Sequence, residues 1–251
     1  MVQMGIMEWI YLSPHADDVA LSCGGLVWEQ ASAGEKVTVW TICAGDPPDP
    51  PFSPFAEMLH RRWQTGPDAV QHRRQEDRQS CARMGASVEQ FSLPDCIYRQ
   101  DAEKTFFLYA AEEAILGPIH PAEAPLVETL RAEIERRIPP QASLVCPMSL
   151  GGHVDHRLTF AAASRYSGNL WFYADFPYIL RAREQLAEKE AAGWRKTVFS
   201  VSSAGLSAWQ DAVAAHASQI STFWPDLDAM GLALRQYCNE AGGIPLWQAS
   251  S

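Results

Sequence analysis

Basic residues are scarce in this chain of 251 residues: 20 lysines and arginines stand against 30 aspartates and glutamates, and the formal net charge is −10. General nucleic-acid binding needs a basic footprint, and so does docking on anionic lipid. The composition therefore argues against nucleic acid and against a membrane surface as partners. A local basic pocket for a small molecule is still compatible with it.

The chain also lacks the patterns of oxidised, membrane-spanning and exported proteins. Its six cysteines are scattered without a C-x-x-C pair, and several lie in apolar runs, where a reduced cysteine packs as a small hydrophobic side chain. No apolar stretch reaches the roughly 18 residues of a membrane span. Residues 1–8 show no basic region followed by an apolar one. We therefore expect a cytoplasmic protein in a reducing compartment.

The chain is 47% hydrophobic, which at this length suits one large α/β domain over residues 1–251. Residues 9–13 form a short apolar run that predicts a buried strand, and 19–32 predict a helix with acidic residues at its start. Residues 36–44 predict a second strand. A strand, a helix and a strand in this order imply a parallel sheet with a right-handed crossover.

Two later segments interrupt this pattern. Five prolines between residues 46 and 54 exclude regular structure there, so 46–71 is expected to be a long loop, and 95–125 is irregular and aromatic. The sequence thus predicts a single Rossmann-like, doubly wound α/β domain with a mainly parallel sheet and these two loop insertions. Further strands are expected at 88–93, 143–147, 170–176 and 197–201, and further helices at 73–85, 127–137, 181–192 and 208–223.

Polar clusters follow two of the predicted strands. Residues 13–18 read Ser-Pro-His-Ala-Asp-Asp, and residues 153–156 read His-Val-Asp-His. In open parallel sheets, ligands bind at the carboxyl ends of the strands. Imidazole and carboxylate are the ligands that zinc accepts when no thiolate is used, and a catalytic zinc keeps three of them. His15, Asp18 and one of the two later histidines would make such a site.

Simpler interpretations exist for each fragment. An Asp pair before a helix usually caps it, and His-x-x-His alone is weak evidence for a metal. The joint occurrence at two strand ends favours the metal, and the spare carboxylate of Asp17 favours catalysis, because an activated water needs a nearby base. A nucleotide-binding module would instead need a Gly-x-Gly-x-x-Gly turn after the first strand, and Gly24-Gly25 comes too late for that.

At these residues the sequence resembles the PIG-L/LmbE family of N-acetylglucosaminyl deacetylases. Pro14-His15-Ala16-Asp17-Asp18 matches the family's first motif, and residues 153–156 match its second. The resemblance continues through residues 73–77, 93–99 and 175–178, and spans roughly residues 8 to 180. The chain departs from the family where Ala16 and Val154 stand at positions often occupied by proline, and where Val19 follows the Asp pair.

The resemblance implies a Zn²⁺-dependent hydrolase that removes an acetyl group from an N-acetylated amino sugar or sugar conjugate, a small-molecule partner. It implies that His15, Asp18 and His156 bind the metal, so that His156 rather than His153 is the third ligand. Ferrous iron, Fe²⁺, also suits two histidines and an aspartate with an open face. Neither the residues nor the resemblance decides between a monomer and a homo-oligomer.

The resemblance also implies catalytic roles. Asp17 would be the general base, and His153 would act as an acid or stabilise the oxyanion. Asp155 would orient one of the imidazoles, as carboxylates behind metal ligands commonly do. The alternative function is a metal-dependent hydrolase that acts on a different amide or on an ester.

Five residues are expected to contact the substrate, each with a simpler alternative. Asp46 could bind sugar hydroxyls or be a turn residue before prolines. Arg73 and Arg99 could grip a phosphate or carboxylate, although Arg73 could equally pair with the aspartate four residues later on an exposed helix face. Tyr98 and Tyr178 could line the pocket or serve as core packing.

Overall fold

The structure is a computed structural model that describes residues 7–64 and 68–250. The start of the chain, on which the expectation about an export signal depends, therefore lies outside the described residues, as do residues 65–67 of the first predicted insertion. Among the helices of the described part, none is both long and apolar enough to cross a membrane.

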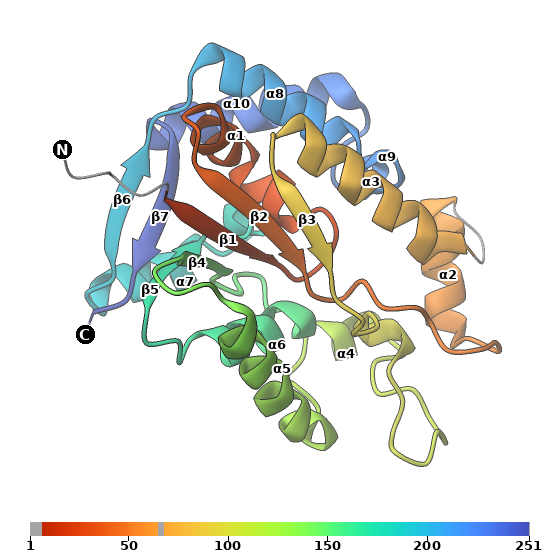
Figure 1. The fold of residues 1–251 in the computed structure, drawn as a ribbon. Helices are drawn as coiled ribbons and strands as arrows, with labels where there is room; N and C mark the ends of the chain where they lie inside the picture. Colours follow the sequence, from red (N-terminus) through yellow and green to blue (C-terminus); the bar gives the residue numbers. More distant parts are fainter. Residues whose placement is uncertain (1–6, 65–67, 251) are drawn as a thin grey trace.

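A seven-stranded sheet runs through the centre of the molecule in the order β3-β2-β1-β4-β5-β7-β6 (Figure 1). The first five strands in this order are parallel to one another, and β7 runs antiparallel to both β5 and β6. The predicted α/β fold with a mainly parallel sheet is confirmed. The strands are β1 (Glu8–Ser13), β2 (Lys36–Thr41), β3 (Ser87–Gln90), β4 (Ser143–Pro147), β5 (Asn169–Tyr173), β6 (Arg195–Phe199) and β7 (Ile244–Gln248).

Helices cover both faces of this sheet. On one face α8 packs against α1 and α3, and on the other α5 packs against α6 (Figure 1). The helices are α1 (Asp18–Ser32), α2 (Pro54–Trp63), α3 (Ala69–Arg83), α4 (Glu112–Ile115), α5 (Ala124–Arg137), α6 (Val154–Ala163), α7 (Arg183–Ala191), α8 (Ser203–Ala214), α9 (Ala217–Phe223) and α10 (Leu227–Ala241), with 3₁₀ turns η2 (Cys96–Tyr98), η3 (Pro121–Glu123) and η4 (Tyr178–Arg181).

Strands β1 and β4 are neighbours at the point where the order of the sheet reverses. From β1 the chain proceeds through β2 to β3 on one side, and later from β4 to β5 on the other. All but the first residue of β1 and all of β4 are buried, as expected for central strands with helices on both faces. Their carboxyl ends open into the crevice where ligands bind in folds of this kind.

The segment 46–71 was predicted to be a loop throughout, and this prediction is wrong in its middle. Helix α2 occupies Pro54–Trp63, because Ser53 caps it by accepting a hydrogen bond from the backbone N–H of Ala56, and Pro54 fits the first helical turn. The segment 95–125 also holds short turns of helix, η2, α4 and η3.

The C-terminal region is more regular than the sequence predicted. The single helix expected at 208–223 is two helices, α8 and α9, that meet near His216. Helix α10 and strand β7 were not predicted at all. Strand β7 inserts between β5 and β6, so the end of the chain completes the sheet.

Candidate metal centre

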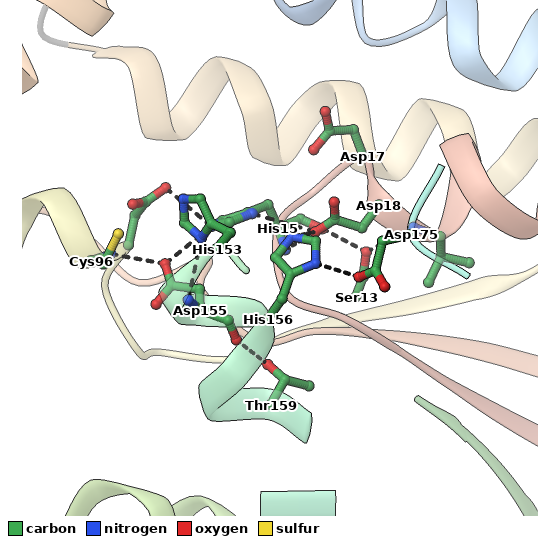
Figure 2. A network of polar contacts seen from close by, with 12 residues as sticks. Ser13, His15, Asp17, Asp18, Cys96, His153, Asp155, His156, Thr159 and Asp175 are labelled. Atoms are coloured by element: carbon green, nitrogen blue, oxygen red, sulfur yellow. Dashed lines mark hydrogen bonds and ion pairs between the residues drawn. The ribbon is translucent and has the colours of Figure 1, made fainter. Parts of the chain in front are cut away.

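The loop after β1 folds back on itself. Ser13 donates its hydroxyl to the carbonyl of His15, and the backbone N–H of His15 donates to Asp18 Oδ2 at 2.7 Å. Asp17 occupies the N-cap position of α1, and Asp18 is the first residue of that helix. This turn brings the His15 ring and the Asp18 carboxylate to the same side of the loop (Figure 2).

The loop after β4 presents the second motif. Gly151 and Gly152 have φ values of 85° and 79°, in the left-handed region that glycine tolerates and that a side chain rarely adopts. The chain can therefore turn sharply into α6. His153 caps this helix, because its Nδ1 accepts a hydrogen bond from the backbone N–H of Asp155 at 3.2 Å. His156 then lies in the first turn of the helix, facing the β1 loop (Figure 2).

Asp18 lies between two imidazole rings. Its Oδ2 is 3.4 Å from His15 Nδ1 and 3.3 Å from His156 Nε2. Tetrahedral zinc with bonds of about 2.0–2.1 Å holds neighbouring ligand atoms about 3.3 Å apart. His156 Nε2 is buried and has no hydrogen-bond partner of acceptable geometry in the described part of the chain. Asp18 Oδ2 is therefore separated from each of these two nitrogen atoms by the distance expected between two ligands of one zinc ion.

Two other sets of possible metal ligands also include His15. Nitrogen atoms of His15, His153 and His156 lie within 4.8 Å of one another, and so do donor atoms of His15, Asp95 and Asp155. The His15 and His153 rings meet edge-on with centroids 4.7 Å apart. The geometry brings His153 into the cluster, so His153 can be either a ligand or a group that faces the ligand sphere.

Each of two histidines has a buried carboxylate behind it. His15 Nε2 lies 3.0 Å from Asp155 Oδ2, and His156 Nδ1 lies 2.6 Å from Asp175 Oδ1. Asp175 also accepts from the backbone N–H of Leu150 at 2.9 Å. Such carboxylates fix the orientation of an imidazole and leave its other nitrogen free for a metal.

Asp175 is the functional residue that sequence reasoning missed. It follows β5, whose end lies beside that of β4. The predicted strand 170–176 extended past it and so concealed it as a strand residue. The same strand-end argument that found His15 would have found Asp175 if the strand had been ended at Tyr173.

The cluster attracts positive charge. Burial alone would lower the pKa of His15, but hydrogen bonds to Asp155 and Asp18 outweigh it and raise that pKa well above its usual value. The pKa of His156 shifts in the same direction: burial opposes protonation, yet Asp18 and Asp175 raise this pKa to about 10. Burial likewise disfavours the charged form of Asp18, but the two histidines lower its pKa well below the usual value. A metal ion would satisfy the same preference for positive charge.

The balance of buried charge also fits a divalent metal. Buried charges are rarely left without a partner, because desolvation is costly. Six buried acids lie in and around the cluster, and among the described residues the arginines that pair with them are Arg73 and Arg99. These acids are Asp17, Asp18, Asp95, Asp155, Asp175 and Glu123.

Asp17 lies apart from the three imidazole rings, on the side of α3 (Figure 2). Its Oδ1 accepts from Arg73 Nη2 at 3.2 Å, and Arg73 Nη1 lies 3.7 Å from Asp95 Oδ2. The alternative in which Arg73 pairs with Asp77 on an exposed helix face does not hold, since the Arg73 side chain is only 14% exposed and turns toward Asp17. Arg73 is thus positioned beside the expected base.

Arg99 was expected to grip a substrate anion, and the structure corrects this. Its guanidinium is buried and forms a two-pronged pair with Glu123 at 2.5 and 3.2 Å, while Nη1 lies 2.6 Å from Asp155 Oδ1. Glu123 in turn accepts from the Tyr109 hydroxyl at 2.7 Å. Arg99 therefore joins the 95–125 segment to the carboxylate behind His15, and has little capacity left for a ligand.

The other three expected substrate contacts differ in their placement. The side chain of Asp46 is 76% exposed and pairs with Arg74, so it lies at the rim and not in the site. Tyr98 is buried, and its hydroxyl lies 2.5 Å from His60 Nε2, yet its ring helps to line the pocket beside Arg73. The Tyr178 ring meets the His156 ring edge-on, with centroids 6.0 Å apart, and so forms a wall of the cluster.

A small pocket adjoins the cluster on the side of Arg73. Ala16 connects it to the His15 loop, and the Trp63 indole of α2 closes it, with the Arg73 guanidinium 5.0 Å above the ring. Asp95 adds a carboxylate to this pocket. Its lining thus combines apolar side chains with two arginines, Arg73 and Arg74, and two aspartates, Asp77 and Asp95, and ligand sites commonly combine an apolar lining with a few polar groups.

Comparison with known proteins shows the family to which this chain is similar. The model of the family described as PIG-L, GlcNAc-PI de-N-acetylase, matches residues 10–167. A 2'-N-acetylparomamine deacetylase of Niallia circulans is 29% identical over 207 residues, which cover 75% of this chain and 72% of that protein. A second 2'-N-acetylparomamine deacetylase, of Streptomyces fradiae, is 29% identical over 179 residues, which cover 67% of this chain and 57% of that protein.

The solved structure of the zinc-inhibited form of the teicoplanin deacetylase Orf2 is similar along almost the whole chain. Its TM-score is 0.79 and its sequence identity 26%, and the match covers 96% of this chain and 97% of that one. The match includes the C-terminal region, where the family model does not reach. The similarity therefore extends to the complete sheet and its helices.

Proposed function

The chain belongs to the PIG-L family and is an N-deacetylase, a hydrolase of linear amide C–N bonds, and we propose that its substrate is an N-acetylated amino sugar or a conjugate of one. The observation that carries this proposal is the position of Asp18 Oδ2 at zinc-like distances from His15 Nδ1 and His156 Nε2, with the carboxylate of Asp17 next to it in the chain. The substrates named for the similar deacetylases support an amino sugar or its conjugate as the substrate.

In this proposal one divalent metal is held by His15 Nδ1, Asp18 Oδ2 and His156 Nε2. Zn²⁺ is the metal that we propose, and Fe²⁺ would accept the same three residues. When bound, such a metal would polarise the amide carbonyl and lower the pKa of a water toward about 7. Asp155 and Asp175 would keep both imidazoles in the orientation that presents these nitrogens.

Asp17 is proposed as the general base. It lies next to the ligand Asp18 but apart from the imidazole cluster, so its carboxylate would not be used as a ligand and would take a proton from the attacking water. Arg73, 3.2 Å from Asp17 Oδ1, would hold that carboxylate in place. After attack the same carboxyl group can return the proton to the leaving amine, so that acetate and a free amine are released.

His153 is proposed to stabilise the oxyanion. Burial, and then the positive charge of His15, lowers its pKa well below the usual value, so the ring is neutral near pH 7. Its Nδ1 accepts from the backbone of Asp155, which leaves the proton on Nε2. A neutral ring with a fixed N–H is a hydrogen-bond donor and a poor acid, so of the two predicted roles we favour the oxyanion donor. Losing such a donor typically costs about 10²–10³ in rate.

Substrate binding is proposed for the pocket beside Arg73. Arg73 and Asp95 would bind hydroxyl groups of the sugar, and Tyr178 would form the wall next to the acetyl group. The six cysteines are all free and buried, which supports the further proposal of a reducing compartment such as the cytoplasm.

The test combines a substrate panel with two histidine variants. Wild-type protein should release acetate from at least one N-acetyl amino sugar, whereas simple N-acyl amines and esters should react far more slowly. His156→Ala should lose bound metal, and His153→Ala should keep the metal but lose about 10²–10³ in kcat. Ester or simple-amide hydrolysis alone would replace the sugar proposal, and metal loss in the His153 variant instead of the His156 variant would reverse their roles.

A further inference from the structure

His216 is a buried histidine with no assigned role. It is the N-cap residue of α9, at the junction with α8, and it is 1% exposed. Neither of its ring nitrogens has a hydrogen-bond partner among the residues that the structure describes. Almost every buried polar group in a folded protein finds a partner, so such a side chain needs an explanation.

Helix α9 is fixed across the edge of the proposed active site at both of its ends. At its start, the backbone N–H and the hydroxyl of Ser218 donate to Glu76 of α3 at 2.8 and 2.6 Å. At its end, the Phe223 ring meets Tyr178 with centroids 5.9 Å apart, and Tyr178 in turn meets His156. The junction that carries His216 is therefore part of the wall around the metal centre.

The same helix α3 carries Arg73, one turn before Glu76. Glu76 thus holds the start of α9 beside the residue that pairs with Asp17. Electrostatics agrees with this placement: after burial, the charges of Asp17 and Arg73 act most on His216, whose pKa burial lowers to about 4. The ring is therefore neutral at ordinary pH.

A neutral imidazole has one N–H donor and one lone-pair acceptor. A carboxylate accepts hydrogen bonds and a guanidinium donates them, so the Asp17–Arg73 pair offers the two complementary groups. An apolar side chain of similar volume would fill the same space without the cost of burying two unpaired nitrogens. Packing alone thus gives no reason for a histidine at this position.

We propose that His216 is a positioning residue of the deacetylation reaction, which acts through Asp17 and Arg73. In the substrate complex its ring would donate to the carboxylate of Asp17 and accept from Arg73, directly or through a substrate hydroxyl, and so hold the base toward the attacking water. This inference rests on the proposed function. It gives the C-terminal helices a part in the chemistry of a site otherwise built from residues 13–178.

The test compares His216→Leu with His216→Gln, two side chains of similar volume of which only glutamine keeps a donor and an acceptor. His216→Leu should lower kcat about 10–100-fold, in line with the effect of a small misplacement of a catalytic group. KM and metal content should stay within twofold of wild type, and Tm should be unchanged or higher. His216→Gln should recover most of kcat, and Gln219→Leu, a buried polar control on α9, should leave kcat unchanged.

Wild-type kcat in His216→Leu would overturn the proposal, and so would an equal loss in both variants together with a lower Tm. A raised KM at constant kcat would make His216 a substrate-binding residue instead. Crystal structures of the two variants with the free amino sugar bound give a readout that needs no turnover: the Asp17–Arg73 pair should be displaced in His216→Leu but not in His216→Gln. If the wild-type protein hydrolyses no amide of the panel, the proposed function fails, and these structures still decide whether His216 positions the pair.

Discussion

At the scale of single residues, the site is organised by what stands behind each candidate ligand. His15 is backed by Asp155, which is itself backed by Arg99 and Glu123. His156 is backed by Asp175 alone, so one carboxylate determines its orientation. Several side chains in series therefore hold the ring of His15, whereas a single carboxylate holds the ring of His156.

Asp175→Asn tests the role of the carboxylate behind His156. An amide lacks the negative charge that holds the Nδ1 proton of His156, so the ring should lose both orientation and basicity. We expect metal affinity to fall about 10–100-fold, measured by competition with a chelator of known affinity. Asp77→Asn, at another buried aspartate of the chain, should leave the affinity unchanged; equal losses in both variants would trace the effect to folding and not to the ligand.

The pKa of Asp77 predicts how the stability of the protein depends on pH. Burial raises its pKa to about 6, although Gln90 and Thr41 donate hydrogen bonds to it. The folded protein thus binds this proton more tightly than the unfolded chain does. The charged carboxylate costs about 3 kcal/mol above pH 6, and the cost disappears as pH falls from about 6 to about 4.

Asp77→Asn should remove this dependence. Urea unfolding of both proteins at pH 4.5 and pH 7 would give the two free energies of unfolding. The free energy of unfolding of the variant, relative to that of the wild type, should be higher at pH 7 than at pH 4.5. Only the wild type carries the buried charge at pH 7. A difference between the proteins that is the same at both values would refute the shifted pKa.

At the scale of elements, the packing of α1 against α8 sets the layer that carries Asp17 and Asp18. Gly24-Gly25 in the middle of α1 could signal either a weak helix or a close approach, and the structure shows a close approach. A Cβ atom added at Gly24 would lie 2.5 Å from Cδ1 of Trp209. The indole cannot move away easily, because it is fully buried and donates to the carbonyl of Ala20 at 2.6 Å.

Gly24→Ala should therefore destabilise the protein. In an exposed helix the change would stabilise by about 1 kcal/mol, since glycine is the poorer helix former. Here we expect a net loss of about 1–3 kcal/mol from overpacking, measured by chemical denaturation. Combining it with Trp209→Leu should recover part of the loss, as expected for residues in contact; additive losses would show that the two positions do not touch.

The sequence predicted the elements with strong local signals and missed those without them. Strands β1 to β4 and helices α1, α3 and α5 lie within a few residues of the predicted ranges, whereas α4 was not predicted and α2 has a Ser53-Pro54 start that was hidden among prolines. Strand β7 is five residues long, contains Pro245, and gains its stability from the two neighbours between which it inserts. That stabilisation is tertiary, so no local pattern could reveal it.

The same distinction holds for the site. His15, Asp17, Asp18, His153 and His156 were identified because each motif is contiguous and ends a strand. The ion pairs of Arg99 could not be identified, because its partners come from other segments of the chain. Arg73 was predicted as a site residue. Its ion pair with Asp17, instead of with Asp77, which is nearer in sequence, depends on how α3 packs over the sheet.

At the scale of the whole molecule, the site forms where the direction of the sheet order reverses. The ends of β1 and β4 supply the motifs, β5 supplies Asp175, and the C-terminal helices close the edge beside Tyr178. Segments more than 100 residues apart in sequence thus converge on one cluster of buried acids. The folded state concentrates negative charge that the unfolded chain disperses, so cation binding and global stability should be linked.

Removal of metal should therefore lower the stability of the entire domain. A ligand that binds only the folded state at a thousand times its Kd adds about 4.1 kcal/mol. For a domain of this size that corresponds to roughly 8–16 °C in Tm. We expect a shift of this order between zinc-loaded and chelator-treated protein in calorimetry. Asp18→Asn should show almost no shift, because it loses the oxygen that lies between the two histidine rings. Equal Tm values for loaded and treated wild-type protein would contradict a metal centre in this cluster, because an ion that binds only the folded protein must raise its stability.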